Sequence, residues 1–158
     1  MKVEFDLNGT SVSTNVEART TLADCIRNDF GQTGTHLACE HGVCGACTVL
    51  VNGEAVRSCL MLAAQASGEK VTTVEGLSGD ELSPLQASFR KHHALQCGFC
   101  TPGFITTAHA LLTHEPNADE DRVREVLSGN LCRCTGYIPI VEAVLDARSH
   151  YARSGEKK

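Results

Sequence analysis

The stretch "CEHGVCGACTVLVNGEAVRSC", residues 39–59, puts three cysteines in one short loop and a fourth after a hairpin pattern. The spacing C-x4-C-x2-C with a distant fourth cysteine is the plant-type pattern for a [2Fe–2S] cluster. The four candidate ligands are Cys39, Cys44, Cys47 and Cys59. Glycines at 42 and 45 let the loop wrap closely and aim backbone N–H groups at an anionic cluster. The first half of the chain is therefore predicted to hold an iron–sulfur site.

Two other kinds of metal site use similar residues. Zinc also accepts four thiolates, but its loops usually carry two short cysteine pairs, whereas this loop carries a triplet. The fragment Cys39-Glu40-His41 matches half of a Rieske site. A Rieske site needs two histidines, and the matching half, Cys44–Cys47, offers none. His41 is therefore expected to be an exposed loop residue near the cluster rather than a ligand.

Composition limits the function classes. The chain has 158 residues, nine cysteines and a formal net charge of −5, which argues against nucleic acid as a partner. The basic cluster "GEKK" at 155–158 is expected to be a solvated tail. The N-terminus carries acidic residues where a signal peptide needs an apolar run, and no stretch is long enough for membrane insertion. We expect a cytoplasmic protein, in which clustered cysteines indicate metal or redox chemistry rather than disulfides.

The first lobe is predicted to be a small sheet with one helix. Apolar and polar residues alternate over 3–7, and Asn-Gly pairs at 8–9 and 52–53 are typical of hairpin turns. A further short strand is expected around 71–74. Apolar residues recur at helical spacing over 22–30 and include Cys25, which is expected to be a buried structural thiol.

The second lobe is predicted to contain four helices. Their patterns cover 83–95, 101–116, 117–130 and 137–151. Ser83 and Thr101 are each followed by proline, so both are expected to be N-caps. The sequence thus indicates an α+β protein, with a lobe made of a small sheet and a helix followed by an all-α lobe.

The second lobe has its own cysteine set, in "QCGFC" (96–100) and "NLCRCTG" (130–136). Its members are Cys97, Cys100, Cys132 and Cys134. Each pair precedes a predicted helix start, which favours negative charge. Taken alone, this spacing fits either zinc or a second [2Fe–2S] cluster, and the ferredoxin-type loop in the same chain favours iron–sulfur. Arg133 either offsets the cluster charge or is an ordinary surface arginine.

The sequence shows no motif for converting a substrate. It has no Ser/His/Asp set, phosphate-binding glycine loop or HExxH motif, and His109 and His114 lie five apart, the wrong spacing for a shared helical metal face. The candidate chemistry is therefore electron transfer. A free-standing, diffusible ferredoxin would explain the first lobe but gives the second no purpose. A zinc-stapled structural module is the third hypothesis.

Three segments together resemble one family. They are "TGTHLACEHGVCGACTVLVNGEAVRSC" (33–59), "LQCGFCTPG" (95–103) and "GNLCRCTGY" (129–137). Together they resemble the iron–sulfur subunit of molybdenum hydroxylases, such as xanthine dehydrogenase, aldehyde oxidoreductase and aerobic carbon monoxide dehydrogenase. The similarity runs from the first strand to the last helix, and Ala38 departs from it where family members often carry glycine. The resemblance implies a β-grasp ferredoxin domain at 1–76 and a four-helix bundle at 77–158, each holding one [2Fe–2S] cluster.

The resemblance also implies an electron route. Family enzymes oxidise a substrate at a molybdenum–pterin centre, and electrons pass through the helical-lobe cluster and then the ferredoxin-lobe cluster to FAD. Gln96 and Cys134 match positions that lie against the pterin in relatives. The molybdenum large subunit and the FAD medium subunit are expected as partners in a heterotrimer, which can pair into a dimer of heterotrimers. The substrate stays open among N-heterocycles, aldehydes, acyl-CoA thioesters and carbon monoxide, because the large subunit binds it.

Overall fold

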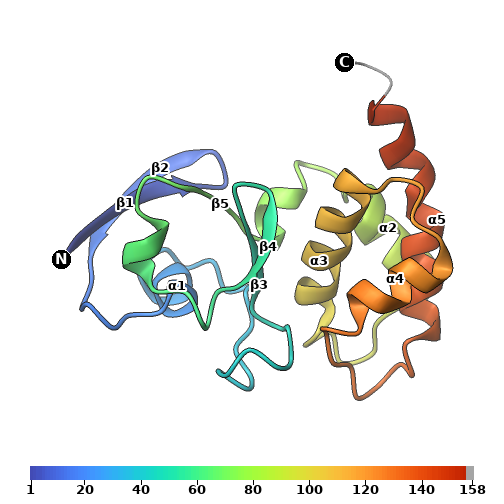
Figure 1. The fold of residues 1–158 in the computed structure, drawn as a ribbon, viewed down its shortest axis with the longest axis horizontal. Coiled ribbons are helices and arrows are strands. Elements are labelled where there is room, and N and C mark those ends of the chain that lie inside the picture. The colour runs from blue at the N-terminus through green and yellow to red at the C-terminus, as the bar shows by residue number, and fades with distance from the viewer. Residues whose placement is uncertain (156–158) are drawn as a thin grey trace.

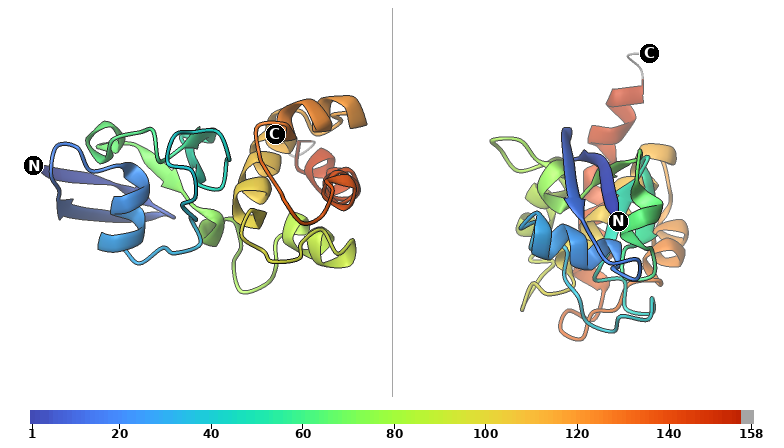
Figure 2. Two further views of the ribbon diagram at one scale, coloured as in Figure 1. Left: turned by 90° about the horizontal axis from the view of Figure 1, so that it is seen from below. Right: turned by 90° about the vertical axis from the view of Figure 1, so that its left-hand side faces the viewer.

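The computed structural model describes residues 1–155, and the chain forms two lobes side by side along its long axis (Figure 1). The first lobe contains a five-stranded sheet with strand order β2-β1-β5-β3-β4. Its strands are β1 Lys2–Leu7, β2 Thr10–Asn15, β3 Thr48–Val51, β4 Glu54–Arg57 and β5 Lys70–Thr72. The view from below in Figure 2 shows the sheet lobe and the helical lobe as separate bodies joined near the middle of the molecule.

Both predicted hairpins are confirmed. Strands β1 and β2 pair antiparallel, as do β3 and β4, while β5 pairs parallel with β1 and antiparallel with β3. Asn8 and Asn52 have φ of 55° and 53°, and the glycine after each also has positive φ, which is what a tight hairpin turn requires. The alternating residues Val3, Phe5 and Leu7 are buried in the core.

The predicted helix of the first lobe is present in an altered form. It begins as α1, Leu22–Asp24, and continues as a π-helix, η1, over Cys25–Asp29. Leu22, Cys25 and Ile26 are fully buried in the core of this lobe. The hydrophobic repeat predicts a helical segment but does not distinguish the α from the π form. Two short 3₁₀ segments complete the lobe, η2 Ala63–Ala66 and η3 Val74–Leu77.

The second lobe contains the four predicted helices. They are α2 Pro84–Lys91, α3 Thr101–His114, α4 Glu120–Leu127 and α5 Ile138–Gly155. Helix α5 contacts the other three, and all four contribute to one apolar core. No helix within residues 1–155 is long and apolar enough to cross a membrane. The expected basic tail and the end of the predicted second domain reach into 156–158, outside the described residues.

One of the two predicted caps is confirmed and the other is wrong. The Ser83 side chain accepts a hydrogen bond from the backbone N–H of Gln86, and Pro84 is the first residue of α2. Thr101, in contrast, is already the first residue of α3, and Cys100 occupies the N-cap position. The Thr101 hydroxyl is buried without a hydrogen-bond partner in the described structure. The threonine–proline pattern therefore marked this helix start correctly but placed its cap one residue late.

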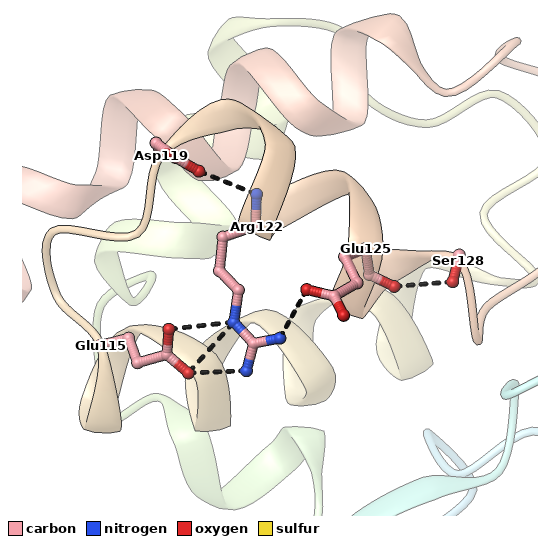
Figure 3. A network of polar contacts seen from close by, with 5 residues as sticks. All are labelled: Glu115, Asp119, Arg122, Glu125 and Ser128. Carbon is pink, nitrogen blue, oxygen red and sulfur yellow. Dashed lines mark hydrogen bonds and ion pairs between the residues drawn. The ribbon is translucent and has the colours of Figure 1, made fainter.

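A polar cluster fixes the turn between α3 and α4 (Figure 3). The Arg122 guanidinium donates to both carboxylate oxygens of Glu115, at 2.7–3.2 Å, and to Glu125 at 2.8 Å. The Asp119 side chain caps α4 by accepting from the backbone N–H of Arg122. This pairing lowers the pKa of Glu115, so the ion pair persists at neutral pH. Helix α4 is thereby held against the end of α3.

The lobes meet where α3 packs on β3 and β4. A Cβ on Gly103 would lie 2.2 Å from the carbonyl oxygen of Gly45, so only glycine fits at this crossing. Gly45 has φ 74°, and a Cβ there would lie 2.6 Å from the side-chain nitrogen of Asn130. The loop that carries the first cysteine set thus lies directly against the start of α3 and the segment before Cys132.

Candidate metal centres

The β3–β4 hairpin brings the first cysteine set together. Cys47 immediately precedes β3 and Cys59 lies just beyond β4, whose Arg57 pairs with Thr48 across the hairpin. The hydroxyl of Ser58 donates to the carbonyl of Cys47 at 2.6 Å, which fixes the two ends of the hairpin side by side. The antiparallel register therefore places the distant fourth cysteine beside the loop triplet.

Backbone N–H groups converge on the sulfur of Cys39. Hydrogen bonds from the backbone of His41 and Cys44 lower its pKa to about 6, and the Cys44 nitrogen lies 3.4 Å from the sulfur. At the other end of the set, burial and the neighbouring Cys47 thiol raise the pKa of Cys59 to about 11. The half-buried Cys39, with its lowered pKa, and the buried Cys47–Cys59 pair form a donor set that suits a metal held by four thiolates.

Two helix starts bring the second cysteine set together. Cys97 and Cys100 directly precede α3, and Cys132 and Cys134 lie in the loop before α5. The sulfurs of Cys97 and Cys134 are 3.6 Å apart, and the Cys132 thiol is near enough to Cys100 to contribute to its raised pKa. Each pair joins one cysteine from "QCGFC" to one from "NLCRC".

The two pairs of the second set differ in environment. Cys97 and Cys134 are exposed, whereas Cys132 is buried. Burial, together with the Cys132 thiol, raises the pKa of Cys100 to about 12. Burial also acts to raise the pKa of Cys132, but hydrogen bonds from Thr135 and Cys134 outweigh it and the net shift is downward. At the exposed pair, the Gln96 side-chain amide donates to the Cys134 carbonyl at 3.1 Å.

The thiols in each set that contact one another do so in pairs. A [2Fe–2S] cluster with four cysteine ligands takes two thiolates at each iron, so paired thiols are a suitable donor arrangement. Paired thiols thus suit the ligand pattern of a two-iron group. Within the described residues, no three histidine, cysteine, aspartate or glutamate side chains lie close enough to hold a single metal ion.

Hydrogen bonds connect the two sets across the lobe interface. The Leu131 N–H donates to the Cys44 carbonyl at 2.9 Å, and the buried Asn130 amide donates to the Gly45 carbonyl at 3.2 Å. On the other side, His36 donates from Nδ1 to the Phe99 carbonyl at 2.7 Å, and the two rings stack 4.8 Å apart. Both cysteine segments of the second lobe are thus anchored to the loop region of the first.

The remaining predicted residues fall outside the two thiol sets. His41 and Arg133 are exposed, and Cys25 is fully buried in the separate core of the first lobe. Three contacts of the cysteine loops are not indicated by any sequence motif; they are made by His36, Asn130 and Thr135. Only their positions in the sequence, a few residues from a cysteine, could have drawn attention to them.

The fold and the two thiol sets define a two-lobed iron–sulfur protein. Family models match both lobes: the "2Fe-2S iron-sulfur cluster binding domain" matches residues 5–78, and the "[2Fe-2S] binding domain" matches residues 73–145. The chain is 58% identical over 147 residues to the nicotine 6-hydroxylase small subunit of Paenarthrobacter nicotinovorans. This alignment covers 93% of this chain and 89% of the relative.

Two solved structures of oxidoreductases are similar to this chain over nearly its whole length. Quinoline 2-oxidoreductase from Pseudomonas putida 86 superimposes with a TM-score of 0.95 at 53% identity, over 99% of this chain and 98% of that one. Aldehyde oxidoreductase from Desulfovibrio gigas superimposes with a TM-score of 0.91 at 38% identity, over 99% of this chain and 18% of that longer one. The chain belongs to the family of iron–sulfur small subunits of the molybdenum hydroxylases. It is an electron-transfer subunit of an oxidoreductase and carries [2Fe–2S] clusters.

Proposed function

We propose that the chain holds one [2Fe–2S] cluster in each lobe, on eight of its nine cysteines. The first cluster is assigned to Cys39, Cys44, Cys47 and Cys59, and the second to Cys97, Cys100, Cys132 and Cys134. The observation that carries the proposal is that the eight thiols gather in two sets in separate lobes, while Cys25 lies apart in an apolar core. When bound, the clusters supply one-electron redox chemistry between a molybdenum–pterin centre and FAD on partner subunits.

The exposed pair is the proposed entry side for electrons. By the family resemblance, Gln96 and Cys134 are assigned to the contact with the pterin. The exposure of Cys97 and Cys134 and the hydrogen bond from Gln96 to the Cys134 carbonyl support this assignment. Cys132 is buried, and its neighbour Leu131 donates to the Cys44 carbonyl of the first lobe. This hydrogen bond gives the two proposed ligand loops a direct connection. The first lobe is then the side that faces FAD.

We also propose a fold for each lobe and a boundary between them. We assign a β-grasp fold to residues 1–76 and a four-helix bundle to residues 77–158. The mixed sheet with its packed helix supports the first, and the apolar core shared by α2 to α5 supports the second. The two family models overlap at 73–78, which supports a boundary in that segment.

We propose a cytoplasmic heterotrimer with a molybdenum large subunit and an FAD medium subunit, paired into a dimer of heterotrimers.

For the substrate of this complex we propose a nitrogen heterocycle. Nicotine and quinoline name the relatives that are 58% and 53% identical, whereas the aldehyde enzyme is 38% identical. The purified complex should therefore reduce an artificial acceptor faster with quinoline or nicotine than with benzaldehyde. Faster turnover of benzaldehyde would contradict this substrate class.

The ligand assignment is tested with Cys134→Ser and Cys59→Ser in the purified complex. Because the two sets lie in different lobes, each variant should lose one of two electron paramagnetic resonance signals of the reduced protein and keep the other. Iron and sulfide analysis should fall by half in both variants. Loss of both signals in each variant, or of neither, would contradict two separate sites.

A further inference from the structure

The loop after Cys132 contains a side chain that contacts a proposed ligand sulfur. The Thr135 hydroxyl oxygen lies 3.2 Å from the Cys132 sulfur, and the Thr135 backbone nitrogen lies 3.4 Å from the same atom. These contacts lie within the hydrogen-bonding range for sulfur. Cys132 is therefore approached by both a hydroxyl and an N–H of a single residue.

The direction of the hydroxyl contact follows from its second neighbour. The Tyr137 N–H donates to the Thr135 hydroxyl oxygen at 3.2 Å, so that oxygen is an acceptor on this side. Its one hydrogen is then free to point at the Cys132 sulfur. A thiolate bound to metal has no hydrogen of its own and can only accept. The hydroxyl is thus the donor in this pair when Cys132 is a ligand.

The loop holds this geometry from both ends. Tyr137 has φ 72°, a left-handed conformation, and its phenol accepts a hydrogen bond from the Cys132 N–H at 3.1 Å. Its ring packs edge-on against Phe104 of α3, with centroids 6.3 Å apart. The positions of both the donor and the sulfur are therefore fixed by the same aromatic residue. Because Cys132 is only 9% exposed, water does not compete strongly for its sulfur.

We propose that the Thr135 hydroxyl raises the reduction potential of the helical-lobe [2Fe–2S] cluster by donating a hydrogen bond to the Cys132 sulfur. This inference rests on the ligand set proposed above. Reduction adds negative charge to the cluster, and a donor aimed at a ligand sulfur stabilises the more negative state more strongly. Thr135 is thus a positioning residue that acts through Cys132 and favours uptake of an electron in the second lobe.

Matched variants at position 135 test this role in the purified complex. Thr135→Val keeps the shape of the side chain and removes the donor, whereas Thr135→Ser keeps the hydroxyl. A redox titration followed by electron paramagnetic resonance reads the two clusters separately. In Thr135→Val, the ratio of reduced to oxidised helical-lobe cluster at a fixed potential should fall about fivefold. Thr135→Ser should stay close to wild type, and the ferredoxin-lobe signal should be unchanged in both.

Three outcomes would overturn the proposal. They are an unchanged potential in Thr135→Val, an equal shift in both variants, and loss of the helical-lobe signal in Thr135→Val, which would make the hydroxyl an assembly requirement. Failure of the ligand assignment itself looks different. In that case the wild-type complex would lack a second [2Fe–2S] signal, or Cys134→Ser would leave that signal intact.

Discussion

Cys25 shows how position separates a structural thiol from a ligand. It is fully buried among apolar side chains of the first lobe, and burial, helped by the nearby Asp29, raises its pKa to about 12. Burial alone does not exclude a ligand, because the pKa of Cys100 is raised to the same value. What separates Cys25 is that no other cysteine belongs to its apolar core cluster. Cys39, in contrast, shares one loop with Cys44 and Cys47, and backbone N–H groups lower its pKa to about 6.

Cys25→Ala should therefore leave iron and sulfide content at the wild-type value. The change removes a buried sulfur and should cost about 1 kcal/mol through the small cavity it leaves. Cys47→Ala is the matched control, since Cys47 is equally buried but belongs to the first thiol set. Metal analysis of both proteins checks the difference. Iron loss in Cys25→Ala would assign Cys25 to a cluster.

At the scale of elements, local signals predicted the structure and tertiary contacts corrected it. The Asn-Gly turns require positive φ, and both hairpins turn there, because that requirement is local to two residues. Thr101 failed as a cap, since Cys100 takes the N-cap position and Thr101 lies inside the helix. The preference of threonine for the N-cap position does not predict at which residue the chain passes from the cysteine loop into the helix.

The contact between α3 and α5 should make stability depend on pH near neutrality. His109 of α3 lies 2.7 Å from the Tyr151 hydroxyl of α5, and burial lowers the pKa of His109. The pKa of His109 in the folded protein lies below the unfolded value of about 6.5. The contribution of the neutral His109 side chain to folding stability is therefore complete above pH 6.5 and declines as pH falls through that value. His109→Gln cannot titrate. Its thermal midpoint should therefore fall less than that of wild type between pH 7.5 and 5.5.

Wild type and His109→Gln share all the other histidines. The difference between their profiles of thermal midpoint against pH therefore isolates the effect of His109. His150 lines the same small cavity as His109 and Tyr151 and is retained in the variant. Parallel pH profiles for wild type and His109→Gln would show that His109 is not destabilised in its charged form.

At the scale of the whole molecule, the two lobes form one electron-transfer unit because their cysteine loops contact each other. The loop triplet of the first set could be predicted from sequence, since Cys39, Cys44 and Cys47 are close in the chain. The second set joins two distant segments, and only the fold shows that Cys97 lies beside Cys134. The bonds from Asn130 to Gly45 and from His36 to Phe99 could not, because they join residues far apart without any periodic pattern. The resemblance to a family supplied the presence of two clusters, and the structure supplied how their loops touch.

The close approach of Gly103 in α3 to the backbone of Gly45 gives a test of the interface between the lobes. Gly103→Ala would bring a Cβ to 2.2 Å from the backbone carbonyl oxygen of Gly45, which cannot move like a flexible side chain. We expect a loss of about 2 kcal/mol, and so a thermal midpoint about 4–8 °C lower. Gly79→Ala is the control, because a Cβ there meets no atom within 4 Å. Since Gly45 lies between two proposed ligands, Gly103→Ala should also alter the ferredoxin-lobe resonance signal although the change lies in α3. An unchanged midpoint and signal in Gly103→Ala would mean that the lobes do not need this close approach, and that the cysteine loops keep their geometry independently.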